Sequence, residues 1–202
     1  MGAWFAGDPT EGDRVYRRLL HVAAGISIIY YLVPVQILPG LSRAALLLIA
    51  LLLVLSLEAC RLAGWLVLPA LRLHEERRPA SFVYFGSAVV VALLVVPEAY
   101  AIVAIVGTAL VDPLIGELRA SPRGARAYPA VPLVVYAAIA LPILSCLGGF
   151  PWASAAALAA AGALLAVAVE SPQSRHLDDD LLMTLVPALG LWALGSAVLR
   201  FT

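Results

Sequence analysis

The sequence predicts an all-α integral membrane protein, a polytopic bundle of about seven transmembrane helices. Of its 202 residues, 63% are hydrophobic and 13% are charged, whereas soluble domains average roughly 45–50% apolar and about 25% charged residues. A bilayer-spanning helix needs about 20 apolar residues, so seven spans with short loops fill this length. We therefore expect a single transmembrane domain over residues 1–202, with no separate soluble domain.

The positions of the spans follow from apolar runs that end at proline, glycine or charged residues. Clear breaks fall at Pro39-Gly40, in the charged stretches 72–79, 119–126 and 170–180, and at Gly148–Pro151. The run 81–118 is too long for one crossing, so we divide it at Pro97-Glu98. The expected spans are 19–38, 42–64, 81–97, 98–118, 128–147, 152–170 and 180–200.

The charged residues are distributed unequally between the two ends of these spans. All 13 basic residues are arginine, and alternating the spans leaves only Arg43 and Arg200 on one side, so the other eleven (13 − 2) lie opposite. The positive-inside rule makes the arginine-rich side, with the N-terminus, cytoplasmic. The carboxylates share this asymmetry, apart from Glu98. Transporters place polar groups at the midplane with access from both faces, so one-sided polarity favours a membrane enzyme with a cytosolic polar substrate and a lipid co-substrate.

Asp112 is the most informative single residue. A carboxylate inside an apolar helix costs about 2.5–3.5 kcal/mol on insertion scales, and no basic residue lies three or four positions away to neutralise it. Pro113 opens the helix beside it, and Gly116 leaves room for a ligand one turn later. We interpret Asp112 as a functional residue.

The remaining clusters suit phosphate and cation binding. Without lysine, phosphate must be held by arginine, histidine, backbone N–H groups or a metal. Arg17, Arg18 and His21 share one helix face; this face fits a phosphate site or a lipid anchor, and a histidine favours the first. Glu58 and Arg61 either neutralise each other or belong to the phosphate site. The run 72–79 is either a solvated loop or contributes Arg77 to that site. Carboxylates of Glu170, Asp178 and Asp179 suit Mg²⁺.

These clusters, in this order, resemble the CTP-dependent lipid kinase and cytidylyltransferase superfamily. Its members include dolichol kinase, phytol kinase, yeast-type diacylglycerol kinase and, more distantly, phosphatidate cytidylyltransferase. Four stretches carry the resemblance: Arg17-Arg18-x-x-His21-x-x-x-Gly25 is similar to R-K-x-x-H-x-x-x-G; Glu58-x-x-Arg61 to E-x-x-R; Glu76-Arg77-Arg78-x-Ala80-Ser81-x-x-Tyr84-Phe85 to E-R-R-x-S-G-x-x-Y-F; and Glu170 with Leu177–Leu181 to E…L-D-D-N-L, with Asp180 in the place of Asn. The nucleotide loop departs from the family pattern. Val111 replaces the Gly before Asp112, and the stretch Arg123–Pro129 replaces the K-[ST]-x-E-G element.

The resemblance implies a CTP-dependent polyprenol (dolichol-type) kinase, with Mg²⁺ as cofactor and CTP, an isoprenoid alcohol and the bilayer as partners. It implies catalytic roles for Asp112, His21 and Asp179, and metal binding by Asp112, Glu170, Asp178 and Asp179. Nucleotide contacts would come from Arg17, Arg18, Arg61, Arg77, Gly116, Arg123 and Arg126. The alternatives are a phosphatidate-type cytidylyltransferase and a non-enzymatic transporter or scaffold. No nucleic-acid partner is expected, and the sequence leaves homo-oligomer formation open.

Overall fold

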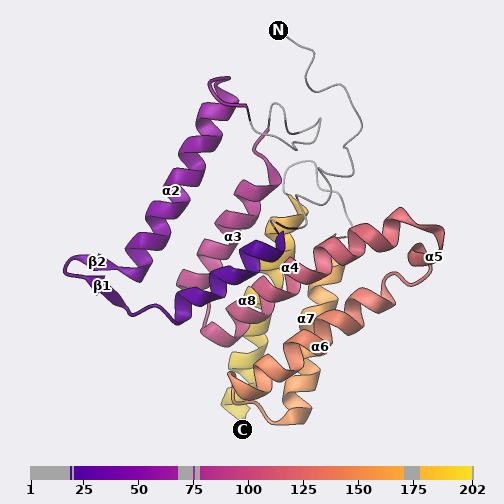
Figure 1. Cartoon of the computed structure of the whole chain (residues 1–202). Helices are drawn as coiled ribbons and strands as arrows, with labels where there is room; N and C mark the ends of the chain where they lie inside the picture. The colour runs from indigo at the N-terminus through magenta and orange to yellow at the C-terminus, as the bar shows by residue number, and fades with distance from the viewer. Residues whose placement is uncertain (1–18, 20, 68–74, 76–77, 171–177, 202) are drawn as a thin grey trace.

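The computed structural model describes residues 19, 21–67, 75, 78–170 and 178–201, and within them the chain is a helical bundle with one short β-hairpin (Figure 1). A helical segment, His21–Tyr31, comes first and ends in the 3₁₀ turn η1 (Ile26–Tyr31). The hairpin β1 (Gln36–Leu38) and β2 (Leu41–Ser42) follows. The α-helices are α2 (Arg43–Leu62), α3 (Ser81–Val95), α4 (Glu98–Ala120), α5 (Pro122–Ala125), α6 (Ala130–Cys146), α7 (Trp152–Glu170) and α8 (Asp179–Phe201).

The all-α prediction is confirmed, and the helices suit a membrane. In the described chain, four helices are long and apolar enough to cross a bilayer, namely α2, α4, α7 and α8. Three further apolar helices are shorter: His21–Tyr31, α3 and α6. Leucines and valines remain exposed along α2 and on the outer faces of α3 and α8, as expected for surfaces that face lipid tails rather than water.

The predicted break between the third and fourth segments is confirmed. Helix α3 ends at Val95, and α4 begins at Glu98 immediately after Pro97. The residue before a proline is forced towards the extended region, and Val96 has φ −92° and ψ 139°. Proline then suits the start of the next helix, where no intrahelical N–H partner is required.

The prediction of one continuous span over 19–38 is wrong in its second half. The helix ends at Tyr31, because Pro34 disfavours the helical conformation of its predecessor. Gly40 then turns the hairpin with φ +83°, the left-handed region that favours glycine. The guanidinium of Arg43 closes the helix end by donating to the carbonyls of Tyr30, Tyr31 and Val33 at 3.4, 3.4 and 3.1 Å.

The centre of the bundle is α4, whose neighbours pack on it from several sides. Helices α6 and α8 both pack against α4, and α4 buries residues along most of its length. Alanine-rich α7 packs closely against α6 and α8, because small side chains let helix backbones approach. By contrast, α2 packs mainly on α3 and stands at the edge of the bundle (Figure 1).

One of these close approaches yields a stability prediction. A Cβ atom added at Gly107 of α4 would lie 2.3 Å from Cε2 of Tyr136, and both residues are buried. We expect Gly107→Ala to lower the free energy of unfolding by about 1–3 kcal/mol through overpacking, measured by thermal unfolding in detergent. The matched change Gly86→Ala in α3 meets nothing within 4 Å and should be neutral or stabilising by up to about 1 kcal/mol. Equal losses in both variants would contradict this packing argument.

Candidate active site

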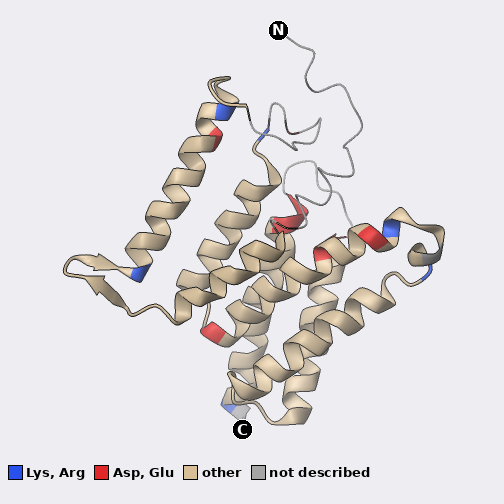
Figure 2. Ribbon diagram, viewed as in Figure 1, with Lys and Arg blue, Asp and Glu red and all other residues tan. Residues whose placement is uncertain are grey.

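Charged residues of the described chain gather towards one end of the bundle, in the upper part of Figure 2. This end holds the last turn of α2 with Glu58 and Arg61, the C-terminal residue of α7, Glu170, and the first turn of α8 with Asp179 and Asp180. The opposite end holds Arg43 at the start of α2, Glu98 at the start of α4 and Arg200 near the end of α8. The one-sided charge pattern of the sequence is therefore also present in space.

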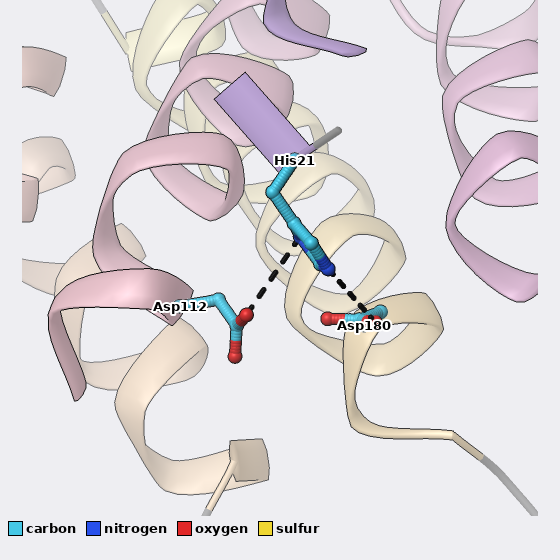
Figure 3. A group of neighbouring side chains, drawn as sticks. All are labelled: His21, Asp112 and Asp180. Carbon is cyan, nitrogen blue, oxygen red and sulfur yellow. Dashed lines mark ion pairs between the residues drawn. The ribbon is translucent and has the colours of Figure 1, made fainter. Parts of the chain in front are cut away.

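Three residues from distant parts of the sequence meet at the polar end (Figure 3). His21 Nδ1 lies 3.7 Å from Asp112 Oδ2, and His21 Nε2 lies 3.6 Å from Asp180 Oδ2. Ligand atoms of these three side chains all lie within 4.8 Å of one another. The imidazole thus stands between two carboxylates, one from α4 and one from α8.

Contacts between the surrounding helices hold the His21 ring and tie together the two helices that carry the aspartates. The His21 ring stacks on Phe85 of α3, with ring centroids 5.1 Å apart and planes 17° apart. Thr108, one turn before Asp112, donates its hydroxyl hydrogen to the carbonyl of Met183 at 2.9 Å, which ties α4 to α8 within a turn of both aspartates. Pro113, inside α4 and next to Asp112, has no N–H to donate to the turn before it.

The start of α8 forms an adjoining acidic cluster. Asp178, Asp179 and Asp180 offer ligand atoms within 4.8 Å of one another, and Asp180 is 3% exposed. Asp178 Oδ1 accepts a hydrogen bond from the backbone N–H of Asp180 at 3.1 Å, which is the interaction by which an aspartate caps the start of a helix. Capping therefore explains the carboxylate of Asp178 but not those of Asp179 and Asp180.

The structure brings together His21, Asp112, Asp178 and Asp179 from the predicted site, but Glu170 has other partners. Its carboxylate receives two hydrogen bonds from the guanidinium of Arg119, the longer at 2.7 Å, and one from the hydroxyl of Tyr128 at 3.2 Å. Arg119 also lies over the Tyr128 ring, 4.5 Å from its centroid. This arrangement joins the ends of α4 and α7, and Glu170 is in neither group of metal-type ligands found in the described chain.

Arg61 is likewise engaged within the fold rather than open to a nucleotide. Its guanidinium is almost fully buried and binds both carboxylate oxygens of Glu58, at 2.6 and 2.8 Å. It also donates to the carbonyls of Glu75 and Arg78 at 3.0 and 2.7 Å. Of the two interpretations given by the sequence for Glu58 and Arg61, mutual neutralisation fits these contacts.

The other predicted nucleotide contacts are at exposed positions or outside the described residues. Gly116 and Arg126 are exposed, and the space around Gly116 is open. Arg17, Arg18, Arg77 and the side chain of Arg123 lie outside the described residues. The sequence did not predict a role for three residues at or next to the site: Asp180, which stands where the resembled motif has Asn, and Ser81 and Phe85, which lie within the third motif.

The donor set is chemically suited to a magnesium ion. Mg²⁺ prefers oxygen ligands at about 2.1 Å, so two ligands of one ion lie at most about 4.2 Å apart. Asp112 and Asp180 belong to one group of ligand atoms within 4.8 Å of one another, and Asp178, Asp179 and Asp180 form a second such group, so Asp180 is common to both. The chain shows no significant similarity to any family model, curated protein or solved structure. Its chemistry is therefore inferred from these side chains.

Proposed function

We propose that this protein is a membrane-embedded, Mg²⁺-dependent phosphotransferase, and specifically a CTP-dependent kinase of a polyprenol or dolichol-type alcohol. The observation that carries the proposal is the meeting of His21, Asp112 and Asp180 at the polar end of a bundle of long apolar helices. A water-soluble nucleotide reaches such a site from the aqueous side, and a lipid alcohol reaches it from the bilayer.

The spatial arrangement of the motif residues supports the finer assignment. The opening motif supplies His21, the nucleotide-loop segment supplies Asp112, and the late motif supplies Asp178 and Asp179. These three segments are far apart in the sequence, yet His21 and Asp112 share one group of ligand atoms with Asp180, and Asp180 also belongs to the group formed with Asp178 and Asp179. Catalysis of phosphoryl transfer depends on positioning and charge neutralisation. An acidic site to which several motifs contribute suits both requirements.

We assign the following roles within this reaction. Asp112, Asp178 and Asp179 would hold Mg²⁺, which would supply charge neutralisation on the transferring phosphate. The terminal oxygen of the alcohol forms a bond to the γ-phosphorus, the bond from that phosphorus to the bridging oxygen breaks, and CDP leaves. His21 accepts the hydroxyl proton. Exposed Arg126, with Arg17, Arg18, Arg77 and Arg123, supplies cations for the phosphates, since arginine binds phosphate through paired N–H groups.

The membrane topology is part of the proposal. We propose that all seven apolar helices cross or enter the bilayer and that the polar end faces the cytoplasm, with the N-terminus on that side. Successive helices alternate in direction, with Arg43 and Glu98 starting helices at the opposite end. The positive-inside rule then assigns the arginine-rich end to the cytoplasm.

Transfer of label from CTP to lipid tests the proposal. Purified protein in detergent is incubated with Mg²⁺, γ-labelled CTP and a pool of polyprenols, dolichols and diacylglycerol, followed by organic extraction. We expect labelled isoprenyl phosphate, with no labelled lipid when Mg²⁺ is chelated. Lipid labelled only from α-labelled CTP would instead identify a cytidylyltransferase. No labelled lipid with either nucleotide would refute CTP chemistry.

A further inference from the structure

The hydroxyl of Ser81 links the acidic cluster of α8 to α3. Ser81 is the first residue of α3, and its Oγ lies 3.0 Å from Asp178 Oδ2. The same oxygen lies 3.0 Å from Glu75 Oε1. Asp178 is 97 positions away in the sequence, so this hydrogen bond joins two segments that meet only in the folded chain.

Each carboxylate around Ser81 has a backbone donor of its own. Glu75 Oε1 accepts the backbone N–H of Ser81 at 3.1 Å, and Asp178 Oδ1 accepts the N–H of Asp180 at 3.1 Å. A hydroxyl has a single hydrogen. With the N–H of Ser81 serving Glu75, that hydrogen is available to Asp178 Oδ2. Both oxygens of Asp178 then have a donor, which fixes the plane of the carboxylate.

The residues around Ser81 are held by buried hydrogen bonds. Glu75 is 5% exposed, and its carbonyl accepts a hydrogen bond from Arg61. The buried pair of Arg61 and Glu58 is closed by two short hydrogen bonds, and Glu58 also accepts the N–H of Ala80, the residue before Ser81. An unbroken series of hydrogen bonds therefore runs from the last turn of α2 to Asp178.

We infer that Ser81 is a positioning residue for Asp178, holding this carboxylate in the orientation that binds the divalent cation. The inference rests on the proposed function, because it takes Asp178 as a cation ligand. Groups that hydrogen-bond to a ligand fix its orientation, and their loss typically weakens metal binding by about 10- to 100-fold. The hydroxyl is thus expected to act on cation affinity through Asp178, without touching the substrate.

Binding of Mn²⁺ alone, followed by electron paramagnetic resonance on the detergent-solubilised full chain, tests this inference. We expect Ser81→Ala to raise the Kd for Mn²⁺ about 10-fold. Ser81→Thr keeps a hydroxyl and should restore binding close to the wild-type level. Ser42→Ala is the matched control: Ser42 caps α2 by accepting the N–H of Ala45 at 3.1 Å, at the opposite end of the bundle, and its loss should leave the Kd unchanged.

The outcomes separate this inference from the proposed function. Wild-type Mn²⁺ binding that Ser81→Ala preserves would overturn the inference alone. Equal weakening in Ser81→Thr or in Ser42→Ala would also overturn it, because a hydroxyl at this position would then not be the cause. A wild-type protein that binds no Mn²⁺ would overturn the proposed function, and the inference with it.

Discussion

Replacing Asp112 by asparagine is expected to reduce phosphoryl transfer from CTP by about 100-fold or more. The side chain lies between α4 and the first helix, with Oδ2 facing His21 at 3.7 Å. Asparagine keeps the size of the side chain but removes one negative charge. Both the attraction for a divalent cation and the interaction with His21 are therefore weakened. Initial rates with γ-labelled CTP, measured over a range of Mg²⁺ concentrations, give the size of the effect. We also expect the Mg²⁺ concentration at half-maximal rate to rise.

Glu98→Gln is the matched control for this variant. Glu98 lies in the same helix, α4, but at its exposed first turn near the opposite end of the bundle. The chemical change is the same, from carboxylate to amide, and we expect the turnover to stay at the wild-type level. If Asp112→Asn retained normal turnover while the wild type was active, the roles assigned to this site would be wrong, even if the protein remained a kinase.

Most of the helices could be predicted from the sequence, because a membrane helix is defined by local properties. Apolar length, proline and charge are all written in consecutive residues, so the break at Pro97 was predicted correctly. The hairpin after Tyr31 was missed, although Pro34 lies in the predicted span and Gly40 lies in the break that follows it. Apolar residues on both sides concealed it, and its closure depends on Arg43, whose contacts with three backbone carbonyls arise only on folding.

The sequence predicts which residues form the candidate site better than it predicts which of them face one another. Asp112 stands out because a carboxylate in an apolar helix without a local basic partner requires a distant one. The sequence does not reveal that His21 faces Asp112 and Asp180 together, since this depends on how three helices pack. Charge alone also fails to separate Arg61, which is buried against Glu58, from an arginine that is free to bind phosphate.

The largest expected loss of stability comes from Arg61→Ala. The guanidinium of Arg61 and the carboxylate of Glu58 are both about 5% exposed or less, and the pair is held by two hydrogen bonds. Removing one partner of a buried ion pair leaves an uncompensated charge, which costs about 3–5 kcal/mol. Thermal unfolding in detergent, followed by circular dichroism, measures the change. Arg200→Ala, at an exposed arginine near the end of α8, should change stability by no more than about 0.5 kcal/mol.

A double variant, Glu58→Leu with Arg61→Met, separates the charge from the hydrogen bonds. Replacing both partners of a buried ion pair by apolar residues is often neutral or stabilising, so the double variant should be more stable than Arg61→Ala. Recovery should nevertheless be incomplete, because the carbonyls of Glu75 and Arg78 and the N–H of Ala80 lose their partners, and each unsatisfied buried group costs about 1–3 kcal/mol. These three groups lie in the segment that leads to Ser81, so the double variant should also bind Mn²⁺ more weakly than the wild type. Full recovery of stability would show that Arg61 contributes to the fold only by neutralising Glu58. Unchanged Mn²⁺ binding would show that the end of α2 does not influence cation binding by the acidic cluster.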